Sequence, residues 1–354
     1  MKPTRLRLLV TLAAIATAAG GFSGCQPGAS SGDRPEIWLA NVPHVDLAAR
    51  PVVDATQEAE IKALIRQLAD VDRPDCGYAS TLTGDRFSPV AGVESWQTMV
   101  LMDHHLRQSE SFTRLVALGP TALPYLLQAL DDDTPTKLTI HHDGGFGAMW
   151  FGHELDGNGV NHREANVLKV ADQKNQQLQA ALFERALSSY TVKVGDLCFV
   201  AIGQITNRSY NTVRYQPTAC IVINSPVQEH DLAGEVRGIW SHDDPARRLL
   251  DSLLTDFSTR GNRGSDLQSG AATRLLYYFP RETSSLILDR LKGLDVVSSE
   301  WALRKAHNQV DEEAFIRAVA FTTDAEIRKV LVHIMETTTD ADIADFLRQH
   351  GAKE

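Results

Sequence analysis

Apolar residues recur at helical spacing along much of the chain, and the clearest series surrounds Gly119-Pro120. Two leucines, Leu115 and Leu118, precede this dipeptide. The leucines that follow it are Leu123, Leu126, Leu127 and Leu130. Intervals of three and four residues place such side chains on one face of a helix, whereas Gly and Pro favour the end of one helix and the start of the next. The pattern therefore predicts the corner of a helical hairpin.

Two later segments have the same plan. Residues 271–291 carry an apolar series that is broken at Phe279-Pro280, and residues 318–334 carry one that is broken by a Thr-Thr-Asp turn. The interval between Phe279 and Phe321 falls within the period of about 40 to 47 residues that is typical of HEAT-type helical repeats. We expect stacked helical hairpins here, and helices throughout the region from Asp244 onward.

Further helices are predicted in the first half of the chain. Asp54 is a suitable N-cap for a helix whose apolar stripe begins at Ile61. Helical spacing is also found over residues 94–118 and about 172–188, and in another helix that Asp196 is expected to cap. In that last helix the residues expected to face the interior are Cys198, Phe199, Ile202 and Ile205.

A different pattern interrupts these helices. Residues 136–142 alternate between polar and apolar side chains, residues 143–145 are turn formers, and residues 146–151 form an apolar and aromatic run. Alternation on both sides of a turn predicts a β-hairpin, which we place in an insertion over about residues 136–165. The short apolar stretch 220–223 fits either a strand or an extended buried connection.

The N-terminus has the composition of an export signal. Lys2, Arg5 and Arg7 precede an apolar run over residues 8–19, which is too short to span a bilayer as a stable helix. Small residues follow this run up to Cys25. We therefore expect residues 1–24 to be a signal peptide.

The end of this signal, Phe22-Ser23-Gly24-Cys25, resembles the lipobox of bacterial lipoproteins, although Phe22 stands where that family usually has Leu. The resemblance implies that Cys25 is acylated and becomes the mature N-terminus; an ordinary cleaved signal is the alternative. Residues 25–52 would then be a lipidated flexible tether and lead-in. Gln26 is not the Asp that tends to retain lipoproteins at the inner membrane, which favours an outer-membrane anchor facing the periplasm.

The charge balance and the cysteines narrow the class of protein. The formal net charge is −10, and removal of the signal removes three basic residues and no acidic ones. An acidic surface argues against nucleic acid as a partner. Because an exported protein can form disulfides, Cys198 and Cys220 are a candidate pair.

Histidines gather around the predicted hairpin, with carboxylates beside them. Imidazole and carboxylate are ligands that zinc or iron takes in proteins. The residues concerned are His141, His142, His153, His162 and Glu154, of which His142, His153 and Glu154 are the leading metal-ligand candidates. The zincin spacing is not met, because Gly157 stands four positions after His153. We favour exposed or hydrogen-bonded loop histidines and no cofactor, and keep zinc as the alternative.

A polar and aromatic stretch offers a second candidate site. Arginine provides a fork of donors and tyrosine a flat face, which together suit a carboxylate or a sugar. The possible ligand lip consists of Arg208, Tyr210, Arg214 and Tyr215. The favoured alternative is that these residues anchor a loop, with their polar groups satisfying buried backbone atoms.

The repeat segments resemble bacterial HEAT-repeat proteins, including the group named after phycobiliprotein lyase repeats. The resemblance is better over residues 244–350 than over residues 94–132 and is absent from the hairpin region. It implies a mainly α fold, an irregular α-solenoid of HEAT-like helical hairpins with the β-hairpin insertion in its middle. It also implies a scaffold or protein-binding surface on stacked helices. We divide the body into an N-terminal helical region, 53–235, and C-terminal repeats, 236–354.

The sequence contains no nucleophile elbow, phosphate-binding loop, dinucleotide fingerprint or Cys-x-x-Cys pair, so enzymatic activity has no positive support. We therefore expect a membrane-tethered, non-enzymatic protein-binding or scaffolding lipoprotein of the bacterial cell envelope, with an envelope or periplasmic protein as its partner. One alternative is a metal-dependent hydrolase or lyase that uses the His141–His162 region. Another is a lipoprotein that binds a carbohydrate or small ligand at the lip.

Overall fold

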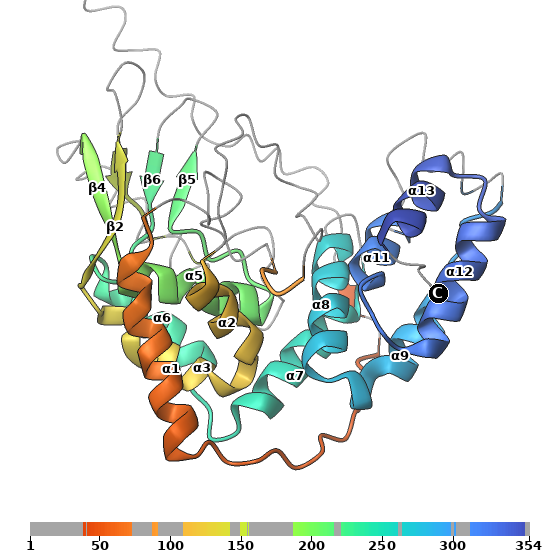
Figure 1. Ribbon diagram of the computed structural model, residues 1–354, viewed down its shortest axis with the longest axis horizontal. Helices are drawn as coiled ribbons and strands as arrows, with labels where there is room; N and C mark the ends of the chain where they lie inside the picture. The colour runs from red at the N-terminus through yellow and green to blue at the C-terminus, as the bar shows by residue number, and fades with distance from the viewer. Residues whose placement is uncertain are drawn as a thin grey trace, which may run out of the picture. The chain divides into compact units, whose positions relative to one another are not determined.

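The described part of the chain is mainly helical, as the sequence predicts (Figure 1). The computed structural model describes residues 38–39, 41–72, 87–90, 109–141, 149–153, 155, 187–215, 221–260, 264–298, 301 and 312–350. All of these belong to one compact unit, Ile37–Glu354, and the other unit, Met1–Glu36, lies outside the described residues. The predicted signal peptide, Cys25, and the predicted helical stretches 94–108 and 172–186 also lie outside them.

The first helical hairpins are built from the leucine-rich series around Gly119-Pro120. Asp54 caps α1 as predicted, because its carboxylate accepts the backbone N–H of Gln57 at 2.8 Å. Ile61 and Ile65 are the buried residues of its stripe. The elements are α1 (Ala55–Gln67), the 3₁₀ turn η1 (Leu68–Asp70), α2 (Glu110–Leu118), the 3₁₀ turn η2 (Gly119–Thr121), α3 (Leu123–Gln128) and the 3₁₀ turn η3 (Ala129–Asp131).

The corner at Gly119 depends on the absence of a side chain. Gly119 has a positive φ of 55°, a conformation that residues with a Cβ rarely adopt. A Cβ placed there would also lie 2.3 Å from Cε1 of Tyr278, whose hydroxyl donates to the carbonyl of Val116. The predicted corner is therefore confirmed, and a tyrosine from much later in the chain packs directly against it.

Within the described part of the chain, the helix α5 (Val194–Thr206) is enclosed throughout, and every one of its residues is buried. Asp196 lies at its third position, not at its N-cap: the N-cap is Lys193, whose backbone N–H donates to the Asp196 carboxylate at 2.8 Å. This corrects the predicted cap. The strand β4 (Ser189–Lys193) runs directly into the helix, so the carboxylate reaches back from inside the first turn.

The strand pairing differs from the predicted hairpin. The predicted strands exist as β2 (Pro135–His141) and β3 (Met149–Phe151), but they belong to different sheets. β2 pairs antiparallel with β4, with Ile140 opposite Tyr190. Exposed and buried side chains alternate along both β2 and β4. Leu138 and Ile140 therefore lie on the same buried face as the buried residues of β4.

The second sheet gathers the short apolar strands. β3 pairs parallel with β6 (Ile221–Ile223), and β6 also pairs antiparallel with β5 (Val213–Tyr215). All of β6 is buried, which suits a central strand with partners on both edges. The apolar stretch near residue 221 is therefore a strand, one of the two predicted possibilities.

The C-terminal part is a series of helices that pack on one another. The break at Phe279-Pro280 separates two helices as predicted, and Asp324 caps another. Helix α6 was not predicted, because two glycines interrupt its apolar series, and it spans the expected boundary at residues 235 and 236. The helices are α6 (His230–Trp240), α7 (Pro245–Phe257), α8 (Gly264–Tyr278), α9 (Pro280–Lys292), α11 (Glu312–Val319), α12 (Ala325–Thr337) and α13 (Ala341–His350).

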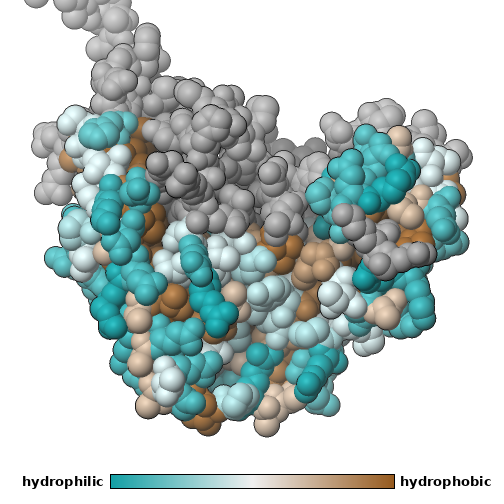
Figure 2. All heavy atoms as spheres, viewed as in Figure 1, coloured by the Kyte–Doolittle hydropathy of each residue, from teal (hydrophilic) through white to brown (hydrophobic). Residues whose placement is uncertain are grey.

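The segment before α1 is extended and joins the start of the described chain to the first turn of α1 (Figure 1). Its first two residues form β1 (Trp38–Leu39), which pairs antiparallel with β7 (Thr259–Arg260) after α7. On the face shown in Figure 2, hydrophilic residues cover most of the described outer surface, and hydrophobic ones show in small patches. Within the described residues, no helix has both the length and the apolar content needed to cross a membrane.

Candidate functional site: a buried polar network after α5

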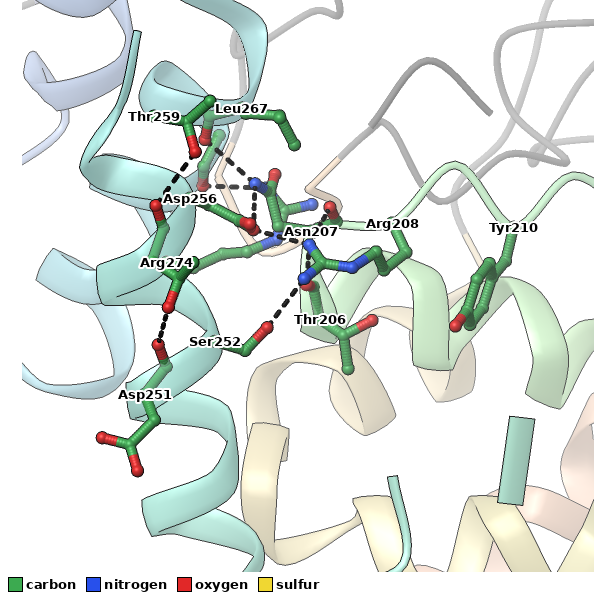
Figure 3. Close-up of polar contacts among 12 residues, drawn as sticks. Thr206, Asn207, Arg208, Tyr210, Asp251, Ser252, Asp256, Thr259, Leu267 and Arg274 are labelled. Atoms are coloured by element: carbon green, nitrogen blue, oxygen red, sulfur yellow. Dashed lines mark hydrogen bonds and ion pairs between the residues drawn. The ribbon is translucent and has the colours of Figure 1, made fainter. Parts of the chain in front are cut away.

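The network begins where α5 ends. The C-cap of α5 is Asn207, whose φ of 61° lies in the left-handed region that asparagine tolerates. This conformation reverses the chain, and the N–H of Arg208 donates to the carbonyl of Gly203 at 2.9 Å. As a result, the side chains of Asn207 and Arg208 both enter the interior between α5, α7 and α8 (Figure 3).

Arg208 forms a buried ion pair with Asp256 of α7. Its Nη1 lies 2.5 Å from Oδ2 of Asp256, and neither side chain is exposed. The guanidinium makes further hydrogen bonds: Nη2 donates to Ser252 Oγ at 2.7 Å, and Nη1 donates to the carbonyls of Thr206 at 3.1 Å and Asn207 at 2.9 Å. A buried charge is tolerated only when it is paired and hydrogen-bonded in this way.

Asn207 connects the same carboxylate to α8. Its Nδ2 donates to Asp256 Oδ2 at 3.1 Å and to the carbonyl of Leu267 at 3.0 Å, whereas its Oδ1 accepts from Arg274 Nη1 at 2.9 Å. The network needs a glycine here as well, because a Cβ at Gly270 would lie 2.1 Å from Asn207 Oδ1. One asparagine therefore ties α5, α7 and α8 together.

Arg274 extends the network back to α5. Its Nε donates to the carbonyl of Gln204 at 2.5 Å, and its guanidinium lies 5.0 Å from the ring centroid of Phe87. The side-chain oxygen of Gln204 accepts from the backbone N–H and the hydroxyl of Ser88 at 2.9 and 2.6 Å. The short segment at residues 87–90 is thereby fastened to the helices.

The possible ligand lip is not exposed at Arg208 and Tyr210, and the hydrogen bonds of Arg208 to backbone carbonyls agree with the favoured alternative, an anchor for a loop. Tyr210 is buried, stacks on Phe199 at a centroid distance of 4.8 Å, and accepts a hydrogen bond from Trp240 Nε1 at 2.9 Å. Burial occurs because the reversal at Asn207 turns the segment inward, and Arg208 satisfies two backbone carbonyls there. Arg214 and Tyr215 lie in β5, and their side chains are outside the described part.

A second buried polar cluster surrounds Asp196. Its carboxylate accepts hydrogen bonds from the hydroxyls of Tyr190 at 2.7 Å and Ser225 at 2.5 Å, in addition to the backbone N–H of Lys193. Burial raises the pKa of Asp196 to about 6, and these hydrogen bonds partly oppose the shift. Burial also raises the pKa of Tyr190. The cluster holds β4, the first turn of α5 and the segment after β6 together.

The histidine candidates are only partly within the described residues. His141 is exposed at the end of β2, whereas His153 is buried with its Nε2 3.2 Å from Oε2 of Glu235 on α6. His142, Glu154 and His162 lie outside the described residues, so the metal site remains a prediction. Within the described ranges, no three His, Cys, Asp or Glu side chains are grouped closely enough to hold a metal ion.

Cys198 is a free, buried thiol, which contradicts the disulfide with Cys220 that the sequence suggested. Cys220 itself lies outside the described residues. The physical reason is that Cys198 lies in the first turns of α5, a helix enclosed on every side, where it packs as a small apolar group. Burial raises the pKa of the Cys198 thiol, so it remains protonated.

The residues of the network that sequence reasoning missed are Asn207, Asp256 and Arg274. A signal for two of them exists, because Asp256 and Arg274 occupy charged positions within the apolar series of α7 and α8. Such residues are rarely buried unless they are paired. The donors and acceptors of the network bind other parts of the same chain. The network therefore stabilises the packing of α5, α7 and α8 against one another.

Searches with family models, against curated proteins and against solved structures found nothing that matches this chain.

Proposed function

We propose that this protein is a lipid-anchored component of the bacterial cell envelope that binds other envelope or periplasmic proteins and does not catalyse a reaction. The anchoring rests on the basic, apolar and small-residue signal that ends at Cys25. The observation that carries the binding role is the serial packing of helices: α7 on α8, α8 on α9, α9 on α12, and α12 on α13. Stacked helical hairpins of this kind bury one face on their neighbours and leave another for partners.

The finer fold, an irregular HEAT-like solenoid, is part of this proposal. One local feature supports a repeated unit: α12 and α13 begin with the same cap. Asp324 accepts the N–H groups of Glu326 and Ile327 at 3.0 and 3.1 Å, and Asp340 accepts those of Asp342 and Ile343 at 2.8 and 3.1 Å. A repeated cap starts each helix at an equivalent place relative to the turn before it.

Lipidation is tested by growing cells with an alkyne-bearing fatty acid and detecting label on the purified protein. We expect label and membrane association for the unsubstituted chain, and loss of both for Cys25→Ser. Cys76→Ser is the matched control and should keep both. A Cys25→Ser protein that still carries the label would exclude this anchor. The same membrane fractions, separated by density, test the outer-membrane assignment.

Partner binding is tested by placing a photo-cross-linking residue at Lys329, which is well exposed on α12. We expect discrete cross-linked products with envelope proteins from this position. Lys62 on α1 is the control position, because it is also exposed but lies outside the C-terminal series. Equal cross-linking from both positions, or none from either, would contradict a binding surface on the C-terminal helices.

The metal-dependent hydrolase or lyase is kept as a second candidate, because the buried His153 pairs with the half-buried Glu235, and both are of the residue types that bind zinc. Elemental analysis of the purified chain tests it, together with His142→Ala and His153→Ala variants. Stoichiometric zinc or iron that is lost in both variants would replace our proposal with this one. A folded, metal-free protein that ignores added zinc would remove it.

A further inference from the structure

Residues 38–39 and 41–50, which we call the strap, contact β7, the first turn of α7 and the C-terminal end of α8. The backbone of Trp38 and Leu39 pairs antiparallel with Arg260 and Thr259 of β7. From residue 43 to residue 47 the exposure alternates, with Pro43, Val45 and Leu47 half-buried and the residues between them exposed. This period of two is that of a strand lying on a surface by one face.

The middle of the strap is held through its backbone. Nη1 of Arg247, in the first turn of α7, donates to the carbonyl of Val45 at 2.7 Å. The same guanidinium is paired with Asp251, to which its Nε donates at 3.1 Å, so it is oriented without help from the strap. Because the acceptor is a backbone carbonyl, any extended chain can make this contact at this point, whatever its side chain is.

The end of the strap is held by one arginine. Nη2 of Arg50 donates at 2.6 Å to the carbonyl of Tyr278, the last residue of α8, and its guanidinium lies 4.5 Å from the ring centroid of Phe279. Carbonyls at a helix C-terminus lack partners within the helix and attract positive charge. The carbonyl at the end of α8 and the Phe279 ring therefore favour a cationic side chain at this position.

None of the residues 41–54 is buried, although Val45, Leu47 and Val53 pack against the core. Beneath the strap, Leu249, Leu275 and Phe279 are fully buried when the strap is in place. A surface segment with no buried residue opens at a lower free energy than a helix that the core encloses. This distinguishes the strap from α5, which cannot be removed.

We propose that the strap-binding face, formed by Thr259–Arg260, Arg247, Tyr278 and Phe279, is a binding site for an extended peptide of a partner protein that carries an arginine, and that the strap occupies this site within its own chain. The inference names the partner class for the protein-binding role proposed above and so rests on it. The strap shows the chemistry of the ligand: a strand that pairs with β7, a free carbonyl for Arg247, and an arginine at the end of α8.

The test measures how tightly a fluorescently labelled synthetic peptide of residues 37–51 binds to the purified mature chain, with fluorescence anisotropy as the readout. The attached strap competes at a high effective concentration, so the unsubstituted chain should bind the peptide weakly. Arg50→Ala in the chain loosens its own strap and should tighten peptide binding by about tenfold or more. A peptide with the same Arg50→Ala change should lose that binding. Arg281→Ala, at an exposed arginine in the first turn of α9, is the control and should bind as weakly as the unsubstituted chain.

Hydrogen exchange on the unsubstituted chain gives a second test that needs no variant. The β7 amides paired with the strap should exchange faster than those of α7, because the strap opens while the helix stays folded. Exchange of both sets at one common rate would overturn the proposal, as would a folded Arg50→Ala chain that does not bind the peptide. Failure of Cys25 labelling would leave these results untouched, and failure of peptide binding would leave the lipid anchor untouched, so the two proposals fail separately.

Discussion

Arg208 and Asp256 form an ion pair in which both side chains are fully buried, with Nη1 and Oδ2 2.5 Å apart. The pair joins the turn after α5 to α7, and hydrogen bonds from Asn207 and to Ser252 complete it. The two partners are far apart in the sequence, so the contact connects the end of α5 to a helix that forms much later in the chain. It is the centre of the fastening between the N-terminal and C-terminal helices.

Removing one partner of this pair should be strongly destabilising. Asp256→Ala leaves the guanidinium of Arg208 buried without its counter-charge, and we expect a loss of about 3–5 kcal/mol in the free energy of unfolding. Urea unfolding followed by circular dichroism measures this. Lys329→Ala, which removes an exposed pair with Glu326, is the control and should change stability by less than about 1 kcal/mol.

The double variant Arg208→Met/Asp256→Leu sharpens this test. It removes both charges together, so we expect it to be clearly more stable than the sum of the losses measured for Arg208→Met and Asp256→Leu alone. Additive losses would mean that the two side chains do not act as a pair.

Asp196 should make stability depend on pH between about 4 and 6. Its pKa is raised from 3.8 to about 6 in the folded protein, so the folded state binds the proton more tightly than the unfolded state does. The stability from this group is therefore fully present below the unfolded pKa and is lost as the pH rises through the folded pKa. Two pKa units correspond to about 3 kcal/mol as an upper figure.

Asp196→Asn isolates this contribution, because asparagine does not titrate. The free energy of unfolding of both proteins is measured from about pH 4 to about pH 7, a range that covers most of the titration of this one carboxyl group. We expect the variant to gain stability relative to the unsubstituted protein as the pH rises. Parallel curves for the two proteins would show that Asp196 titrates normally.

Gly119→Ala should destabilise the corner between α2 and α3. The φ of 55° is unfavourable for alanine, and the new Cβ would collide with the ring of Tyr278. We expect a loss of about 1–3 kcal/mol in thermal or urea unfolding. Gly234→Ala is the matched control: nothing lies within 4 Å of a Cβ at that helical position, so alanine should stabilise by about 0.5–1 kcal/mol. Equal effects at the two glycines would contradict this account of the corner.

Cys198 should be unreactive in the folded protein. Its thiol is buried and its pKa is raised by burial, so the reactive thiolate is scarce. Iodoacetamide followed by peptide mapping should leave Cys198 unmodified until urea unfolds the chain. A peptide that contains Cys198 linked to Cys220 would instead support the disulfide.

Local signals explain which parts of the fold were predictable. The corners at Gly119-Pro120 and Phe279-Pro280 and the cap at Asp54 depend on residues that are neighbours in the sequence. Helix α6 was missed, because Gly234 weakens the same local signals. There the burial of one face against other helices outweighs the intrinsic preference of glycine.

Contacts between distant residues explain what was not predictable. The alternation that predicted β2 was read correctly as a strand, but its partner is β4 instead of β3, because register and pairing depend on which apolar face is available in three dimensions. Arg208 was considered for a ligand lip, since exposure is expected of an arginine in a polar stretch. Asp256, on another helix, supplies the counter-charge that allows its burial.

The sequence by itself therefore determined the mainly helical class, the corners at Gly119-Pro120 and Phe279-Pro280, the cap at Asp54, and the N-terminal pattern on which the proposed lipid anchor rests. Tertiary structure alone decided that Arg208 and Tyr210 face the interior, that Asp196 is enclosed with Tyr190 and Ser225, and that the segment before α1 lies across later helices. The physical reason is one of range. Helix starts and ends depend on backbone groups a few residues apart, whereas the burial of a charge depends on a partner that only the folded chain brings within bonding distance.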